Sequence, residues 1–456
     1  MLKQKQLGGA RSNGAILMTE GPIGKKIILF AIPLFWGNLF QQLYNTADSL
    51  IVGNFLGSDA LAAVSSSSNL IFLMVGFFNG VFMGSGVVVA RNYGAKRYEK
   101  LSKAVHTAFA LALVAGVLLT VIGMVLSPIL LRLMGTPEDV MPNSVAYFKT
   151  YFLGSIGFVL YNCMVGILQS VGDSRHPLVY LIVSSIVNVV LDLVFIGVFH
   201  MGVEGAAYAT VIAQFLSAFL CLIHLTRVDA EYRLTLSKVG FDMETLGLIL
   251  KYGLPSGIQN SIISLANVVV QSNINAFGKM AMAGSGSYSK IEGFGFLPIN
   301  CFTMSLTTFI SQNLGAKEYD RAQKGAKFGI MCSAGLAELL GILIFIFAPM
   351  LIGMFDSTPE VIAYGVTHAR TVTLFYCLLA FSHCCAAILR GAGRAAIPMY
   401  IMLGVWCVLR ITYITVIVRI VPAIGAIFWA YPLTWGISSI LFLIYLLKSD
   451  WLYSFM

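Results

Sequence analysis

Two stretches of this chain repeat each other: ARNYGAKRYEKLSK at residues 90–103 and SQNLGAKEYDRAQK at residues 311–324. Six of the paired positions carry the same residue, among them Gly94 and Gly315, and all pairs are 221 residues apart. The same offset joins Gly57 with Gly278, Pro128 with Pro349, Lys149 with Arg370, Gly172 with Gly393 and Pro177 with Pro398. One offset shared by this many residues, most of them turn-forming, indicates that the chain contains one structural unit twice.

The composition indicates whether this unit folds in water or in a lipid bilayer. Of the 456 residues, 58% are hydrophobic and 11% are charged, whereas soluble domains carry about 25% charged residues. A helix that crosses a bilayer needs about 20 apolar residues, and the chain supplies such stretches almost from end to end. We therefore predict an all-α, polytopic membrane protein. Water-soluble enzymes, disordered scaffolds and β-barrels, whose strands alternate over about ten residues, are excluded.

Apolar runs between charged or Gly/Pro-rich breaks give twelve expected transmembrane helices. Their limits are 26–50, 60–89, 103–127, 146–170, 177–199, 204–226, 246–274, 284–312, 324–348, 361–389, 397–420 and 424–447. The longest polar connection, 227–245, divides them six and six. The expected organisation is an N-terminal segment 1–25, a first six-helix lobe 26–226, the linker 227–245, a second lobe 246–448 and a tail 449–456. Because six is even, both lobes enter from the same side, which is the parallel-repeat arrangement of transporters with a substrate cavity between the halves.

The distribution of basic residues predicts the orientation. Of the 29 Lys and Arg residues, 22 fall on one set of loops and ends, and the opposite set holds Arg132, Lys279 and Arg419, with Lys149 and Arg370 near it. Basic loops stay in the cytoplasm, so both termini are expected there. The net charge of +9 is then a property of these loops and no sign of nucleic-acid binding. The N-terminus shows no removable signal peptide.

Six ionisable side chains remain inside the predicted spans: Asp48, Asp192, Lys290, Glu292, Glu338 and Arg410. Such groups are costly in hydrocarbon and usually mark function. None has an ionisable counterpart at the 221-residue offset, so a symmetric scaffold carries asymmetric charges. A site that couples an ion to transport needs to exist only once, which favours a functional interpretation.

Polar stripes run along one face of three spans in the first half. They are Gln41, Tyr44 and Asp48; Ser184, Asn188 and Asp192; and Thr210, Gln214 and Ser217. Spacings of three, four, seven and eight residues place each set on one helix face. Carboxylate, amide and hydroxyl oxygens suit a proton or a hard cation such as sodium, and burial favours a protonated carboxylate. The stripes predict an ion site; a hydrogen-bond network without a transport role is the alternative.

The second half offers weaker candidates. Its polar stripe on the seventh span is neutral and fits helix packing as well as cavity lining: Asn260, Ser264, Asn267 and Gln271. Glu292 lies in the glycine-rich stretch GSGSYSKIEGFGFLP, residues 284–298, where we expect a kink. There it meets either a substrate cation or Arg410 in a salt bridge. Gly76, Gly80 and Gly84 form a ladder that predicts close helix contact.

Enzymatic and cofactor signatures are missing from the sequence. There is no HExxH, no GxSxG and no soluble catalytic domain, so no enzyme is expected. The eight cysteines lie in apolar stretches without a CxxC pair, which signals neither a disulfide framework nor a zinc site. We expect no cofactor and no metal apart from sodium as a possible coupling ion.

Four segments resemble the multidrug and toxic compound extrusion (MATE) family, and the resemblance spans nearly the whole chain. They are YNTADSLIVGNFLGSDALAA at 44–63, LQSVGDSRHP at 168–177, GVEGAAYAT at 202–210 and YSKIEGFGFLP at 288–298. The resemblance implies an exporter of amphipathic, often cationic drugs, driven by inward flow of protons or sodium through alternating access. It also implies a cell-membrane location and a monomer.

The resemblance assigns roles to residues that the stripes had already selected. In the bacterial branch with acids in the first lobe, the coupling residues match Asp48, Asn188, Asp192 and Thr210, and the lining aromatic residues match Tyr44 and Tyr147. Another branch carries acids on the seventh and tenth helices; this chain has none there. Further cavity candidates are Gln41, Gln214, Asn267, Gln271 and Glu292.

Two other functions stay open. A flippase for lipid-linked sugars or polyisoprenoid carriers would favour a basic cavity, whereas the spans hold four acids against two bases. A receptor or assembly scaffold would not need asymmetric buried acids. The sequence names neither the substrate nor the ion, and it assigns no role to Lys290, Glu338 or Arg410.

Overall fold

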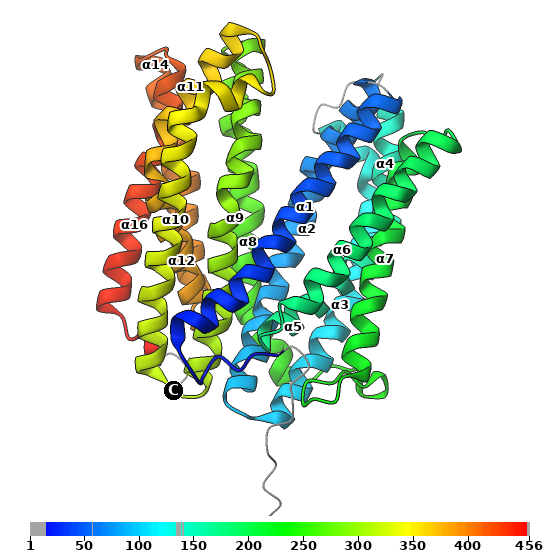
Figure 1. The fold of residues 1–456 in the computed structure, drawn as a ribbon, viewed down its shortest axis with the longest axis vertical. Coiled ribbons are helices and arrows are strands. Elements are labelled where there is room, and N and C mark those ends of the chain that lie inside the picture. Colours follow the sequence, from blue (N-terminus) through cyan, green and yellow to red (C-terminus); the bar gives the residue numbers. More distant parts are fainter. Residues whose placement is uncertain (1–14, 57, 134–137, 139–140, 454–456) are drawn as a thin grey trace, which may run out of the picture.

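The computed structural model describes residues 15–56, 58–133, 138 and 141–453, and the side chains among them except those of 49–50, 53–54, 58–70, 72–74 and 133. Residues 1–14 of the expected N-terminal segment and 454–456 of the tail lie outside this part. The described chain is helical throughout and forms two bundles that diverge toward one end of the molecule (Figure 1). The prediction of an all-α fold is confirmed.

The first bundle contains seven α-helices and one π-helical turn. They are α1 (Ile23–Leu56), α2 (Ser58–Gly94), α3 (Tyr98–Leu133), α4 (Met141–Leu153), α5 (Ser155–Ser170), α6 (Arg175–Asp192), η1 (Leu193–Val198) and α7 (Val203–Arg227).

The second bundle contains nine α-helices and several short turns. They are α8 (Met243–Asn275), α9 (Lys279–Gly315), α10 (Tyr319–Gly353), α11 (Pro359–Val372), η3 (Thr373–Phe375), α12 (Tyr376–Gly391), α13 (Ala396–Met402), η4 (Leu403–Leu409), α14 (Arg410–Ile420), α15 (Ile424–Phe428) and α16 (Ala430–Lys448). The turns η2 (Leu236–Lys238) and η5 (Trp451–Tyr453) flank it.

Each of the twelve predicted spans coincides with one helix or one interrupted helix. Within the described residues, nine segments are long and apolar enough to cross a membrane. The pair α4 and α5, bent by 49°, makes a tenth. The two predicted spans that remain correspond to α2 and α8. Both lie at the centre of the molecule (Figure 1).

Glycines bring α2 and α8 into backbone contact, and this pair makes the most extensive contact between the bundles. A Cβ atom on Gly80 would lie 2.3 Å from the backbone nitrogen of Gly257, and one on Gly84 would lie 2.4 Å from that of Gly253. Asn260 adds a hydrogen bond of 3.3 Å to the carbonyl of Gly76. The glycine ladder therefore serves helix packing, as predicted, and Asn260 of the neutral stripe serves it too.

The repeated motif lies where the two halves meet each other reciprocally. A Cβ on Gly94 would come within 2.1 Å of the Gln312 carbonyl oxygen, and one on Gly315 within 2.2 Å of that of Arg91. Residues 91 and 312, like 94 and 315, are equivalent positions of the repeat. Position 94 of the first half thus meets position 312 of the second, and the equivalent positions 315 and 91 meet in the same way. Such a reciprocal contact indicates a two-fold axis between the halves. Lys96 and Lys317, also equivalent, both adopt positive φ, 54° and 64°.

The segment Ala15–Gly21 crosses the end of the molecule that carries the repeated motif, here called the base. The backbone nitrogen of Met18 donates to Gln312 Oε1 at 2.9 Å, and Gln312 Nε2 donates to the carbonyl of Ser170 at 2.7 Å. Arg321 donates to the carbonyls of Met18, Glu20 and Gly21. The segment, which we call the strap, is thus fastened to the second bundle, and Glu20 forms an ion pair of 3.4 Å with Lys96 of the first.

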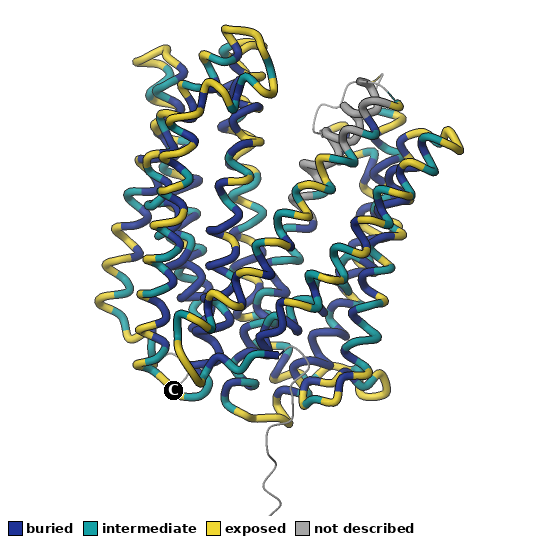
Figure 2. Tube along the Cα trace, viewed as in Figure 1, coloured by how far each residue is buried: buried dark blue, intermediate teal, exposed yellow. Residues whose placement is uncertain are grey.

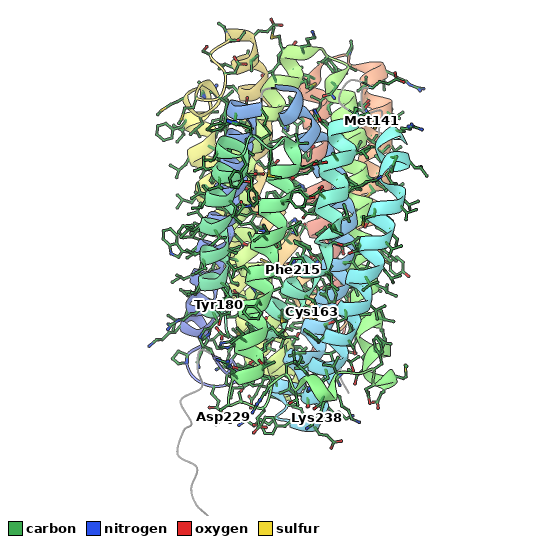
Figure 3. The ribbon with its side chains drawn as sticks, turned by 90° about the vertical axis from the view of Figure 1, so that its right-hand side faces the viewer. Met141, Cys163, Tyr180, Phe215, Asp229 and Lys238 are labelled. Atoms are coloured by element: carbon green, nitrogen blue, oxygen red, sulfur yellow. The ribbon has the colours of Figure 1, made fainter. Side chains whose placement is uncertain are left out.

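The base also holds the connection between the bundles. Asp242 caps α8 by accepting from Thr245 at 3.0 Å and 2.7 Å, and these hydrogen bonds hold the pKa of the Asp242 carboxyl below its usual range. His106 and Thr107 of α3 bind the backbone of Thr235 and Asp242. Met141 marks the opposite end, the mouth, and Asp229 and Lys238 mark the base (Figure 3).

The outer surface is apolar along most of its length. On α3, Val117, Val121 and Val125 are more than half exposed, and Phe219 of α7 is 58% exposed. Buried residues follow the helix sides that face other helices, and exposed residues follow the outer sides (Figure 2). Such a continuous apolar exterior fits contact with lipid.

We predict that Gly84→Ala separates α2 from α8 and lowers the free energy of unfolding by about 1–3 kcal/mol, the usual cost of overpacking. The measurement is thermal unfolding in detergent, and Gly335→Ala on α10 is the matched control because a Cβ there meets nothing within 4 Å. Equal midpoints for the two variants would contradict a tight glycine seam.

Candidate functional site

The three polar stripes of the first bundle meet in one recess between α1, α5, α6 and α7. The recess has a volume of about 30 Å³. All three predicted faces contribute to its polar lining, with Gln41, Tyr44, Ser184, Asn188, Thr210, Gln214 and Ser217, and Ser185, Tyr161 and Asn162 add to it. Helical periodicity, applied to each span separately, therefore selected side chains that the fold brings together.

Asp48 of α1 and Asp192 of α6 interact directly with each other beside this recess. Asp192 is fully buried. Both of its carboxylate oxygens, and Oδ1 of Asp48, are buried without a hydrogen-bond donor in the described part of the chain. Two adjacent carboxylates without donors repel each other when both are charged. The arrangement gains stability from a proton or cation between them.

Asn188 and Thr210 complete the predicted set of four. Asn188 lies one helical turn before Asp192, and its Nδ2 donates to Thr210 Oγ1 at 3.5 Å. The Thr210 hydroxyl donates to the carbonyl of Ala206 at 3.1 Å, which leaves its lone pairs free to accept. Oδ1 of Asn188 has no donor among the described residues. Asp192 ends α6 at the π-helical turn η1, a feature often found at functional sites that the sequence did not signal.

Tyrosines surround the two acids. Tyr44 and Tyr147 both interact electrostatically with Asp48 and Asp192. Tyr147 is 5% exposed within an apolar cluster and lies parallel to Tyr151 at 6.4 Å between ring centroids. Tyr147 lines neither the recess nor the larger cavity described next. It lies in the apolar cluster, close enough to the two acids to interact with them electrostatically. Tyr151 is a neighbour that sequence reasoning missed.

A larger cavity of about 350 Å³ lies between the bundles. Its walls come from α1, α2, α5 and α6 on one side and from α9 and α12 on the other. Gln41, Tyr161, Asn162 and Leu181 line both this cavity and the recess, so the two adjoin. We call it the inter-bundle cavity.

Arg390 of α12 is the charged residue in the described lining of the inter-bundle cavity. It is 8% exposed, and its Nε has no hydrogen-bond partner in the described chain. The sequence placed Arg390 among the basic residues of a loop and did not select it for the cavity. Its position one residue before the end of a helix gave no signal of which way it points.

Two predicted cavity residues of the second bundle lie elsewhere. Asn267 is exposed on α8, and Gln271 donates to Asn275 at 2.8 Å on the same exposed face. Neither lines the recess or the inter-bundle cavity. Their stripe is continuous with Asn260, but the lower part of α8 faces α2 and the upper part does not, because the bundles diverge toward the mouth (Figure 1).

Glu292 lies in a tyrosine network within the second bundle. Tyr288 donates to Glu292 Oε1 at 3.5 Å, and the hydroxyls of Tyr288 and Tyr376 are 2.8 Å apart. Arg410, one of the two expected partners of Glu292, instead donates to Thr434 at 2.7 Å and 3.1 Å and lies over the rings of Trp406 and Tyr431. The described residues thus form no Glu292–Arg410 salt bridge. Glu292 lines neither cavity.

The structure assigns contacts to the two remaining intramembrane charges. Glu338 Oε2 accepts from the backbone nitrogen of Cys377 at 2.9 Å. This donor belongs to the first turn of α12, where helix N–H groups have no partner within the helix. Lys290 is exposed and lies over the Phe355 ring, 5.4 Å from its centroid.

Known proteins resemble this chain in sequence and in fold. The MatE family model matches the chain twice, over residues 33–194 and 255–416. "Probable multidrug resistance protein YoeA" of Bacillus subtilis is 30% identical over 393 residues, which cover 84% of this chain and 85% of that protein. A "FAD transporter" of Shewanella oneidensis is 27% identical and covers 76% of this chain and 77% of its own.

A solved structure shares the fold. It is a MOP superfamily transporter from Pyrococcus furiosus, described by "reverse polarity of binding pocket", with a TM-score of 0.90 and 23% identity. The likeness covers 96% of this chain and 98% of that one. The two chains therefore share the same arrangement of helices.

The hydrogen bond by which Glu338 of α10 caps α12 gives a prediction for stability. Glu338→Ala leaves the Cys377 N–H without its acceptor and lowers the free energy of unfolding by about 1–3 kcal/mol. Glu338→Gln keeps an amide oxygen in place and stays near the wild type. Thermal midpoints of purified protein in detergent measure both changes, and equal losses for the two variants would rule out the hydrogen bond as the cause.

Proposed function

Because the chain belongs to the MatE family of transporters, we propose that it is a secondary active exporter of amphipathic, often cationic small molecules, exchanged for protons or sodium. The observation that carries the proposal is the facing pair Asp48 and Asp192, whose buried oxygens lack donors in the described structure. The protein is a multi-pass membrane protein and no enzyme.

The ion binds beside the recess, between the carboxylates of Asp48 and Asp192. A proton shared by Asp48 and Asp192 removes the repulsion between them. A sodium ion does the same and draws on the unused Oδ1 of Asn188 and the hydroxyl of Thr210, since hard cations take carboxylate, amide and hydroxyl oxygens. Both ions fit the chemistry of the recess, so the exchange is with one or the other.

The substrate occupies the inter-bundle cavity. The recess and the inter-bundle cavity share lining residues, among them Gln41, Tyr161 and Asn162. Through these residues, the charge state of the recess acts on the cavity wall. Binding of an ion and binding of a drug then compete through α1 and α6, whose side chains line both. Coupling needs only that each ligand prefers a different arrangement of these helices.

We place the base in the cytoplasm and the mouth outside the cell membrane. Support comes from the basic residues, which gather at the base in the repeated motif and the linker, since basic loops remain on the cytoplasmic side. With this orientation the strap closes the cytoplasmic end, and the bundles diverge outward. We propose a monomer, as the family resemblance implies; each proposed ion and drug site lies within one chain.

The energy of one ion is sufficient for export. Entry of one positive charge down about 100 mV supplies about 2.3 kcal/mol. A tenfold concentration ratio costs about 1.4 kcal/mol. One proton or sodium ion therefore sustains more than tenfold export of a neutral drug, whereas a monovalent cation exchanged for one proton gains only from the chemical gradient.

A second candidate function rests on Arg390. A guanidinium whose Nε has no partner among the described residues, in a cavity whose described lining contains no carboxylate, favours a substrate with an anionic group. A flippase for phosphate-linked lipid carriers would use such a cavity. The FAD transporter relative is by its name a carrier of a phosphate-bearing compound.

We predict that Asp48→Asn and Asp192→Asn each reduce ion-driven transport to the level of protein-free liposomes, because neither amide can bind and release the ion as a carboxylate does. The measurement uses purified protein in liposomes preloaded with a fluorescent cationic dye, under proton and sodium gradients imposed separately. Glu338→Gln is the matched control, since it also neutralises an intramembrane acid. Full transport in both aspartate variants would refute the recess as the coupling site.

The two substrate classes are separated by Arg390→Gln. If the cavity recognises an anion, this change lowers transport of a phosphate-bearing substrate about tenfold or more, the loss expected for a hydrogen bond to a charged group. Arg394→Gln is the control, because Arg394 binds Tyr445 and the Asp450 carbonyl, away from the cavity. An unchanged rate for the anion, together with active dye transport, would leave the drug exporter as the function.

A further inference from the structure

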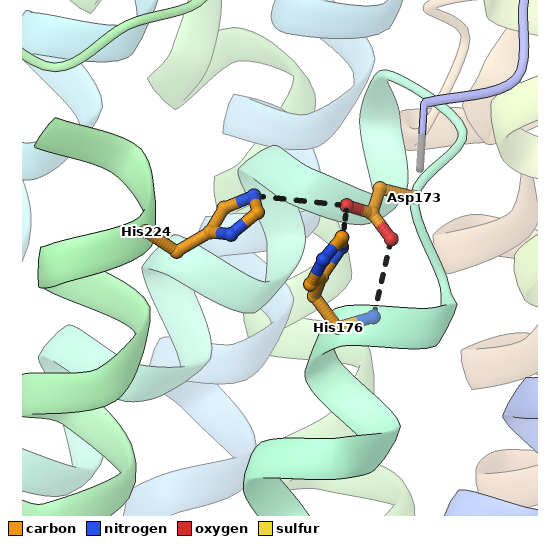
Figure 4. A group of neighbouring side chains, drawn as sticks. All are labelled: Asp173, His176 and His224. Atoms are coloured by element: carbon orange, nitrogen blue, oxygen red, sulfur yellow. Dashed lines mark hydrogen bonds and ion pairs between the residues drawn. The ribbon is translucent and has the colours of Figure 1, made fainter. Parts of the chain in front are cut away.

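A second cluster of titratable side chains lies in the first bundle, toward the base. It consists of Asp173 in the turn between α5 and α6, His176 in the first turn of α6, and His224 in the last turn of α7 (Figure 4). One oxygen or nitrogen atom from each residue lies within 4.8 Å of the other two. Within the described residues it is the one such group of three.

Asp173 is held rigidly at the centre of the cluster. Its side chain is fully buried. Oδ1 accepts from the backbone nitrogens of Arg175 at 3.1 Å and His176 at 3.2 Å, and Oδ2 lies 2.6 Å from His176 Nδ1. The neighbouring Gly172, with φ of +89°, makes the tight turn that points the carboxylate inward. Oδ1 is thus engaged by the backbone, and Oδ2 faces the two imidazoles.

His224 points at this carboxylate at ion-pair distance but beyond hydrogen-bond distance (Figure 4). Its side chain is 12% exposed, and Nε2 is buried without a hydrogen-bond partner in the described part of the chain. That nitrogen lies 3.9 Å from Asp173 Oδ2, and the two imidazole rings have centroids 4.2 Å apart. Buried nitrogen atoms are normally paired, so an unpaired one aimed at a carboxylate indicates a missing partner.

We propose that Asp173, His176 and His224 bind a divalent transition-metal ion, zinc above all. Two imidazole nitrogens and one carboxylate oxygen are a common zinc set, with bonds of about 2.0–2.2 Å. Tetrahedral bonds of that length put ligand atoms about 3.3–3.5 Å apart. In the structure, Asp173 Oδ2 lies 2.6 Å from His176 Nδ1 and 3.9 Å from His224 Nε2. These two separations lie on either side of the tetrahedral range, so small side-chain rotations suffice to bring the three atoms onto one ion.

The surroundings complete the features of a metal site. The backbone hydrogen bonds to Asp173 Oδ1 orient the carboxylate, as outer-shell contacts do in known metal sites. His176 is 33% exposed, which gives an ion a path from the base, and a tetrahedral ion with three protein ligands takes water in its fourth position. The ion joins the end of α7 to the start of α6, the same two helices that carry Thr210 and Asn188 nearer the mouth. The inference does not rest on the proposed transport function.

The test is metal binding to the full-length purified protein, stripped with chelator and titrated with Zn²⁺ by calorimetry. Co²⁺ serves as a second probe, because tetrahedral cobalt gives a strong visible absorption. We expect one Zn²⁺ per chain and a higher unfolding temperature with zinc. His224→Gln should weaken binding more than about 100-fold, since loss of an outer-shell contact alone costs about 10–100-fold.

His176→Asn is the second cluster variant, and His200→Gln is the matched control, because His200 is exposed and lies near the mouth, away from the cluster. Monodisperse elution and an unfolding transition in the absence of metal show that each variant is folded. Equal zinc affinity in wild type, His224→Gln and His176→Asn overturns the proposal. So does a wild type that neither takes up zinc nor shows the tetrahedral cobalt spectrum; the cluster is then a hydrogen-bonded brace only.

Discussion

Backbone contact between the two halves is the constraint on which the rest of the molecule depends. Gly80 and Gly84 let α2 approach Gly257 and Gly253 of α8 to distances that no side chain permits. In a membrane, where burial of apolar surface gives little driving force, such close packing is what holds helices together. The contact joins the bundles along one line near the axis. On either side of that line the bundles can diverge and form a cavity.

The chemistry of the molecule is less symmetric than its backbone. Equivalent residues make the same turns in both halves, as positive φ at Gly172 and Gly393 illustrates. Yet Asp192 corresponds to Tyr413, and two charges of the second bundle serve structure: Glu338 caps a helix, and Arg410 binds a threonine and two aromatic rings. A duplicated scaffold needs its helix contacts twice, whereas an ion site placed in one half suffices for the whole.

The sequence predicted what depends on local periodicity and not what depends on neighbours. Asp48, Asn188 and Thr210 lie on helix faces that their sequence spacing defines. Polar and charged side chains of a membrane helix avoid lipid and therefore face the interior of the bundle. Their meeting inside the first bundle could therefore be expected. Asn267 and Gln271 shared a stripe with Asn260, but whether a stripe faces protein depends on where the partner helix ends. Arg390 and the pair His176 and His224 join segments far apart in the chain. No spacing rule reports such meetings.

The strap has a consequence for how fast the molecule changes shape. Met18 and Gly21 are held by Gln312 and Arg321 of one bundle, and Glu20 pairs with Lys96 of the other at 3.4 Å. The bundles cannot part at the base until these bonds break together. The strap therefore adds to the activation barrier for exposing the inter-bundle cavity at the base.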